Sequence, residues 1–341
     1  MNNEDVLADV EKHANAIIRV CSGYQPAYGL LVIRPDFSCL NPVHATLDSA
    51  FDTPPTAELG TYILGRLPAE LKLMVLRELD ILSFFRFRHV SRRARELSTG
   101  LWEYNLVAKH GREGLRGLLR AGLAHRFTIC DLYQPLITEK CSTCDAFGGL
   151  LFLLTAERCC FTCLQSKAHY HVISPRIYAM LSVIHPARLN RKSIPSLRTV
   201  SGRYTLTTTP VNPPKRLILA EHATQALLAA KVIKEDVIQV LRSQGDEQRQ
   251  RYMATTLYPW YNLKNARPEY GAGCRGCQPP RGLYLDDQAF SARGFLSHFS
   301  QCAEAQRLWA ESEGGTGPLG KPECARPYSF HSFFFSNWLA I

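Results

Sequence analysis

The chain has 341 residues, of which 46% are hydrophobic, so it is long enough for two domains and can fill a real core. The 40 Lys and Arg against 30 Asp and Glu give a formal net charge of +10, which suits an acidic partner without identifying a protein or a nucleic acid. The acidic start lacks the features of a secretory signal, and the apolar run over residues 147–156 is shorter than the roughly 20 residues of a membrane span. We therefore expect a non-secreted, intracellular protein of the cytoplasm, the nucleus or both, without a membrane segment.

The first predicted elements are a weakly ordered lead-in and a helical module. Residues 1–60 contain one amphipathic helix over residues 6–20 and then a proline-rich stretch. A dense helical pattern begins at residue 64, in which apolar residues recur every four positions and share one helix face: Leu67, Leu71, Val75 and Leu79.

Three short helices are expected within this pattern. Pro68 suits the first helical position, where its missing N–H has no intrahelical partner, and the pattern breaks at Asp80. Ser83 and Ser91 are candidate N-caps, because a hydroxyl accepts a hydrogen bond from a backbone N–H left free at a helix start.

The remaining elements are predicted from composition and periodicity. Residues 102–123 favour a helix, whereas residues 127–163 are rich in strand formers and glycine and favour short strands around a metal. Residues 186–216 form a proline-rich linker with one strand over residues 203–209. Residues 217–253 give the longest helical signal of the chain.

Cysteines with metal-ligand spacing form a first group in the middle of the chain. Two C-x2-C pairs indicate a zinc site, because two thiolates at this spacing close on one ion and two pairs complete a tetrahedron. The alternative is a set of buried or disulfide-bonded cysteines, which an intracellular location disfavours. Cys159 could replace Cys160 as a ligand, although the x2 spacing favours Cys160. The predicted ligands are Cys141, Cys144, Cys160 and Cys163.

A second group lies near the carboxyl end and combines three cysteines with a histidine four residues before the last of them. This combination also binds structural zinc, and the alternative is a histidine satisfied within the core. Sequence leaves open whether ligands pair across the two groups. We predict two structural zinc ions, the second held by Cys274, Cys277, His298 and Cys302.

Neither group leaves a coordination position for an activated water, and the sequence contains no catalytic motif, so we expect no enzyme. A basic cluster suggests a runner-up function, a nuclear zinc-binding protein that contacts nucleic acid. A solvated helix surface or a charged rim at a protein interface explains the same residues: Arg86, Arg88, His89, Arg92, Arg93 and Arg95.

The motif LPAEL at residues 67–71, followed by Val90, Ser91, Arg92 and Arg93, resembles the F-box family. Ala94 stands where that family often has tryptophan. The downstream blocks also resemble uncharacterised F-box proteins of filamentous fungi, in which a C-x2-C, a Gly-Gly, an RCCxxCL block and a late GxxCxGC-like segment occur in this order.

The resemblance implies an adaptor of the ubiquitin conjugation pathway, which docks on a Skp-type protein and through it on a cullin-RING ubiquitin ligase. The remaining part of the chain would then present a substrate-binding region, with a substrate and a regulatory signal that the sequence does not identify. The alternative is that the docking residues only pack against the following helices. They are Leu67, Pro68, Leu71, Leu79, Phe84 and Val90.

The predicted fold is mainly α with small β elements, an N-terminal three-helix F-box followed by an irregular α+β region with two structural zinc sites. The expected parts are a lead-in (1–60), the F-box (64–100), a helix with the first zinc segment (101–185), a linker (186–216), a long helix with the second zinc segment (217–310) and a tail (311–341).

Overall fold

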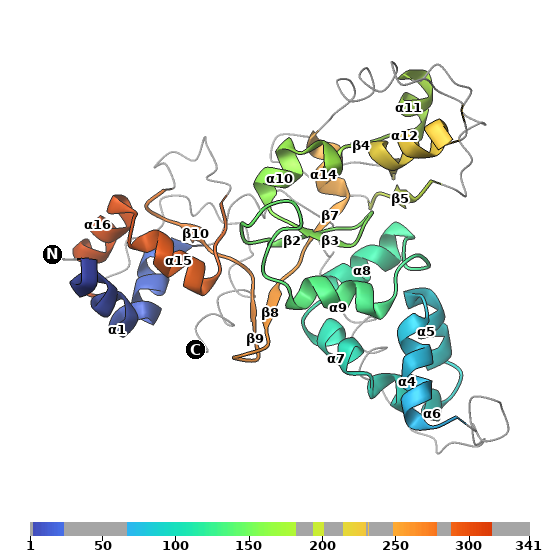
Figure 1. Cartoon of the computed structure of the whole chain (residues 1–341), viewed down its shortest axis with the longest axis horizontal. Coiled ribbons are helices and arrows are strands. Elements are labelled where there is room, and N and C mark those ends of the chain that lie inside the picture. Colours follow the sequence, from blue (N-terminus) through green and yellow to red (C-terminus); the bar gives the residue numbers. More distant parts are fainter. Residues whose placement is uncertain are drawn as a thin grey trace. The chain divides into compact units, whose positions relative to one another are not determined.

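The structure, a computed structural model, describes residues 3–23, 67–181, 194–200, 214–229, 231, 248–277 and 288–315. The chain divides into two compact units, a terminal unit of Met1–Tyr24 with Ala272–Ile341 and a central unit of Gln25–Gly271. Helices dominate both units, and the strands are short (Figure 1). The predicted fold class is confirmed. Within the described ranges, no helix is long and apolar enough to cross a bilayer.

The terminal unit joins an N-terminal helix to segments from the other end of the chain. Helix α1 (Asn3–Cys21) confirms the predicted amphipathic helix, and Ile17 on its apolar face is fully buried. Strand β1 (Ser22–Gly23) follows this helix and pairs antiparallel with β10 (Gly273–Cys274), with Gly23 opposite Gly273. The remaining helices of the terminal unit are α15 (Ala292–Phe299) and α16 (Ala303–Glu311).

The three predicted short helices open the described part of the central unit. They are α4 (Ala69–Glu78), α5 (Ile81–Arg88) and α6 (Arg92–Thr99). Ser91 caps α6 as predicted, by accepting a hydrogen bond from the N–H of Ala94. The prediction that Ser83 caps α5 is wrong. The cap is Asp80, whose carboxylate accepts a hydrogen bond from the N–H of Ser83, and Ser83 lies inside the helix.

The next helical stretch differs from the prediction in two places. The predicted helix over residues 102–123 is two helices, α7 (Trp102–Lys109) and α8 (Arg112–Ala121), with a break at Gly111. The strand prediction is wrong at α9 (Ile129–Ile137). A capping box starts this helix, because Thr128 accepts from the N–H of Asp131 and the Asp131 carboxylate accepts from the N–H of Thr128.

The first sheet follows α9 and has strand order β3-β2-β7. Residues 150–152 form a strand as predicted, and Leu150, Leu151 and Phe152 are all fully buried. Around the sheet lie short helices and a hairpin. These elements are β2 (Leu150–Phe152), β3 (Glu157–Cys159), α10 (Phe161–Ser166), η4 (Ala168–Tyr170), α14 (Gln248–Met253), β7 (Thr255–Leu257), β8 (Trp260–Asn262) and β9 (Arg267–Glu269).

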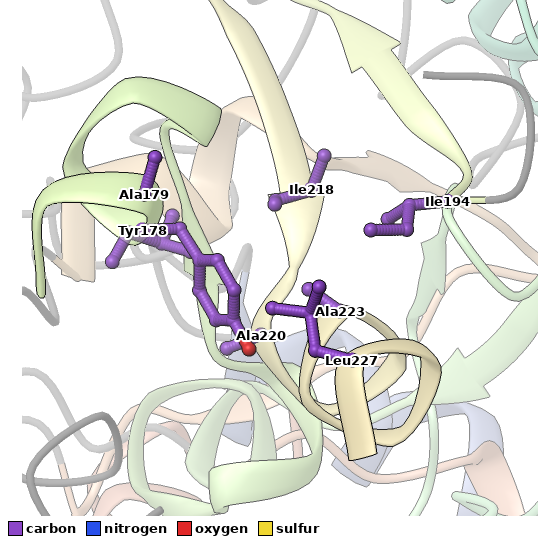
Figure 2. Packing of buried hydrophobic residues seen from close by; sticks show 8 residues of the cluster. Tyr178, Ala179, Ile194, Ile218, Ala220, Ala223 and Leu227 are labelled. Atoms are coloured by element: carbon purple, nitrogen blue, oxygen red, sulfur yellow. The ribbon is translucent and has the colours of Figure 1, made fainter. Parts of the chain in front are cut away.

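A second antiparallel sheet, of order β4-β6-β5, carries its own core. Side chains from the sheet and two helices, among them Ile218 and Tyr178, pack with Ile194 from the segment before β5 into one buried cluster (Figure 2). Its elements are β4 (Val172–Ile173), α11 (Pro175–Leu181), β5 (Ser196–Arg198), β6 (Arg216–Leu219) and α12 (Ala220–Ala229).

The predicted long helix over residues 217–253 is wrong at its start. Leu217, Ile218 and Leu219 lie in β6, where all three are buried in the middle strand of the sheet. A short continuous apolar run fits a buried strand as well as a helix, which explains the error. The predicted strand over residues 203–209 lies outside the described residues.

Candidate functional site

Helix α4 presents an apolar face to solvent. Leu71, Met74 and Val75 have relative exposures of 45%, 57% and 40%, and their spacing of three and four residues puts them on one face. Leu76, on the other side of the helix, is buried at 2%. We call Leu71, Met74 and Val75 the α4 stripe. A face of this kind is typical of a helix that packs against a partner.

The predicted docking residues fall into three environments. Pro68 and Val90 are exposed, and Leu67 and Leu79 are half-buried. Phe84 is fully buried, with its ring 5.0 Å from that of Tyr104, so it offers no surface to a partner and supports the helices from inside.

Met74 is an exposed member of the α4 stripe that was not predicted, although its position three residues after Leu71 places it on the same helix face.

The basic cluster of the F-box helices does not form one exposed surface. Arg88 is 1% exposed, donates to the hydroxyls of Ser98 and Thr99 and lies over the ring of Tyr104. Burial lowers the pKa of Arg88. Arg95 is also buried. These contacts support a role for the two arginines in the helical core and give no support to the predicted nucleic-acid surface.

The first cysteine group comes together between β3, α10 and the loop before β2. The sulfur atoms of Cys144 and Cys160 lie 3.7 Å apart, close to the roughly 3.8 Å between two thiolates on a tetrahedral zinc ion. All four predicted ligands, Cys141, Cys144, Cys160 and Cys163, have their sulfur atoms within 4.8 Å of one another. Cys159 is not among them, and it is fully buried.

Hydrogen bonds link the cysteine side chains of the first group to one another and to the start of α10. Cys160 is the N-cap of α10, and its sulfur accepts from the N–H of Cys163 at 3.3 Å. The hydrogen bond between the side chains of Cys141 and Cys160 lowers the pKa of Cys141 and raises that of Cys160. A cation among these sulfur atoms would remove the repulsion between neighbouring thiolates.

Two buried arginines brace the backbone around the first group. Arg158 donates to the carbonyls of Pro135, Gly148, Tyr258 and Pro259, which ties α9 and the loop before β2 to the segment after β7. Arg251 in α14 donates to the carbonyls of three residues at the end of α10 and after it, Leu164, Gln165 and Lys167. These bonds hold the loops that carry the cysteines.

The second group comes together in the terminal unit. The sulfur of Cys277 lies 3.6 Å from that of Cys302 and 3.3 Å from Nε2 of His298, and the sulfurs of Cys274 and Cys302 are 3.9 Å apart. These four ligand atoms also lie within 4.8 Å of one another. Each predicted group is thus complete in itself, and the two do not exchange ligands.

The backbone of the second group fits tightly against α16 and α1. A Cβ at Gly276 would lie 2.5 Å from the backbone nitrogen of Ala305, so the chain can pass α16 there only as glycine. The side chain of Arg275 donates to the carbonyl of Val20 at 2.8 Å. The thiol of Cys21, whose pKa burial raises to about 12, bonds to the carbonyl of Ala305 and stays protonated beside the ligands.

Comparison with known protein families matches residues 64–106 to the F-box domain. The described part of this match contains α4, α5, α6 and the first residues of α7. The chain therefore carries an F-box domain, whose members generally act as adaptors of ubiquitin ligases. No curated protein and no solved structure matches the chain. The resemblance to fungal proteins remains a prediction.

Proposed function

We propose that this protein is a non-catalytic adaptor subunit that docks on a Skp-type protein of a cullin-RING ubiquitin ligase. The observation that carries the proposal is the exposed α4 stripe within the matched F-box. The other face of the same helix buries Leu76 against the domain, so docking requires no unfolding. Exposed Pro68 and half-buried Leu67 and Leu79 lie at the two ends of α4 and would extend the contact.

Two structural zinc ions form the second part of the proposal. Four thiolates, or three thiolates and an imidazole, match the donor sets that bind structural zinc. Each ion would have all four positions filled by protein side chains, which supports a scaffolding role. Zinc would contribute on the order of 10 kcal/mol of folding free energy at each site at neutral pH.

The docking proposal is tested by co-purification of the intact chain with a Skp-type protein. The double variant Leu71→Glu/Met74→Glu places two charges on the α4 stripe, and we expect it to lower the affinity by about a hundredfold or more, because a charge buried in an apolar contact is costly.

The matched control is Met180→Glu/Leu263→Glu. These two residues are 70% and 53% exposed in the same unit and lie outside the F-box. The control should bind like the natural sequence. Equal binding by both double variants would show that the α4 stripe is not the docking surface.

A further inference from the structure

A basic cleft lies between the end of α8 and the edge of the second sheet in the central unit. It has a volume of about 390 Å³ and is lined on one side by Gly122, His125 and Arg126 and on the other by Ser196, Arg198 and Arg216. No acidic residue lines it in the part of the chain that the structure describes. Three arginines therefore line one small concave space, which we call the basic cleft.

Two of the arginines are held opposite one another by the strand register. Arg198 on β5 pairs with Arg216 on β6, and both are exposed. The neighbouring pair, Leu197 and Leu217, is fully buried and points to the other face of the sheet. Like charges directly opposite on adjacent strands destabilise a sheet, so this pair is unfavourable unless an anion lies between the two cations.

The backbone on both sides of the cleft is well anchored. Ile194, 6% exposed, packs in the core cluster beside β6 and fixes the start of β5 (Figure 2). On the other side, α8 ends at Gly122, whose φ of 75° is left-handed. The N–H groups of Gly122 and Leu123 then bond back to the last carbonyls of α8, and the chain turns so that Arg126 lines the cleft.

No described side chain forms an ion pair with the arginines of the cleft. Among the described residues, Arg126, Arg198 and Arg216 form no ion pair, whereas other exposed arginines, such as Arg92 and Arg307, pair with glutamates on their own helices. A site with uncompensated guanidinium groups and no acidic lining favours an anionic ligand.

The chemistry of the cleft favours a phosphate monoester. Guanidinium groups bind phosphate oxygens through paired hydrogen bonds, and a monoester carries up to two charges against three arginines. The volume is near the lower end of the roughly 300–1,000 Å³ typical of ligand sites, so it suits one phosphorylated side chain. Among the described residues that line the cleft, His125 supplies the one ring and there is no Phe, Tyr or Trp, so the cleft lacks the series of stacking rings that binds a nucleic-acid strand.

We infer that the basic cleft is a phosphate-binding site that recognises a phosphorylated segment of another protein. The inference rests on the proposed function only in assigning the bound protein as a substrate of the ligase. Phosphate binding itself is independent of docking.

The test uses the intact chain and isothermal titration with four probes. These are inorganic phosphate, a glycine-serine heptapeptide with one central phosphoserine, the same peptide without phosphate, and a 12-nucleotide oligothymidine. We expect the phosphopeptide to bind, inorganic phosphate to compete with it, and the unphosphorylated peptide not to bind. Arg198→Gln/Arg216→Gln should weaken phosphopeptide binding by about tenfold or more, because it removes two charge-assisted contacts.

A matched variant, Arg93→Gln/Arg267→Gln, removes two exposed arginines elsewhere in the same unit and should bind the phosphopeptide within about twofold of the natural chain. The melting temperature separates ligand binding from a structural role. Without ligand, Arg198→Gln/Arg216→Gln should melt at the same or a higher temperature, because it removes a repulsive pair.

Several outcomes would overturn the inference. Unchanged phosphopeptide binding by Arg198→Gln/Arg216→Gln would exclude the cleft, and binding of inorganic phosphate alone would exclude a protein ligand. Tighter, steeply salt-dependent binding of oligothymidine would assign the cleft to nucleic acid. A melting temperature of Arg198→Gln/Arg216→Gln below that of the natural chain would show that the two arginines stabilise the fold instead of binding a ligand. Leu71→Glu/Met74→Glu should still bind phosphopeptide, so failure of docking and failure of the cleft are distinguishable.

Discussion

Neighbouring cysteines at the end of β3 have different surroundings. Cys160 lies in the first cysteine group and caps α10, whereas Cys159 points into the core, fully buried, and burial raises its pKa well above the usual value. A buried thiol of that kind is a protonated apolar side chain rather than a metal ligand.

This difference predicts opposite effects of two adjacent substitutions. Cys160→Ala should lower the zinc content of the purified chain from about two ions to about one, because three thiolates no longer close the tetrahedron. Cys159→Ala should retain both ions and lower the stability by about 1 kcal/mol through a small cavity. Metal analysis by mass spectrometry measures both, and loss of zinc in the Cys159 variant alone would reverse the assignment.

The ligand sets could be predicted from residue spacing. The burial of single residues could not be predicted in this way. Two thiolates in a C-x2-C motif reach one ion because of local backbone geometry, so both groups could be predicted without the fold. The sequence predicts Arg88 and Phe84 at the surface, yet both are buried. Their environment depends on Tyr104 in α7, a contact between helices that no local pattern encodes.

At the scale of elements, a histidine links three parts of the central unit. Nε2 of His169, in η4, lies 2.8 Å from a carboxylate oxygen of Glu157 on β3, and Nδ1 lies 3.3 Å from one of Glu221 on α12. Burial alone would lower the pKa of His169, but the hydrogen bonds and charges of the two glutamates raise it overall. The His169 side chain thus links the first sheet to α12, which packs against the second sheet.

The raised pKa predicts a pH dependence with a definite sign. Because the pKa of His169 is higher in the folded than in the unfolded state, its stabilisation is complete below about pH 6.5 and is lost as pH rises through the folded pKa. His169→Gln should therefore cost most stability near pH 6 and least near pH 9. Denaturant unfolding at both pH values measures this, with His125→Gln as an exposed control.

A direct titration can contradict the linkage. The His169 imidazole is followed by NMR in the folded chain, and its pKa should lie above the ordinary value of about 6.5. A value at or below that would mean that burial and the neighbouring His222, rather than the two carboxylates, control the charge.

Elements with strong local signals were predictable, and those chosen by tertiary contacts were not. The F-box helices follow from the four-residue apolar period, and α1 from its amphipathic face. The helix α9 contains many strand formers, but its capping box decided the outcome. Strand β6 is apolar and buried from Leu217 to Leu219 because β4 and β5 flank it, and a single sequence does not show those neighbours.

At the scale of the whole molecule, each unit contains one cysteine group. The first group lies in the central unit with the F-box, and the second lies in the terminal unit, whose core includes α1. The sequence predicts only a lead-in at the N-terminal residues, because nothing in them indicates contacts with residues more than 250 positions away. The contacts of Arg275 with Val20 and of Cys21 with Ala305 make α1 a part of the second site's support.

The division predicts that damage to α1 affects one metal site and spares the other. Ile17→Ala should cost the terminal unit about 2 to 5 kcal/mol, because it leaves a cavity in a fully buried position. Since zinc binding and folding are coupled, the chelator concentration that removes zinc from the second group should fall, while that for the first should not. Cobalt substitution distinguishes the sites by their absorption spectra, because one site has four sulfur ligands and the other has three sulfur ligands and one nitrogen.

The control is Lys12→Ala, which changes an exposed residue on the same helix. Docking on the Skp-type protein should be unchanged in both variants, since the α4 stripe belongs to the central unit. Release of metal from both sites together in Ile17→Ala would show that the two units fold as one, and the independence of docking from the terminal unit would then be lost.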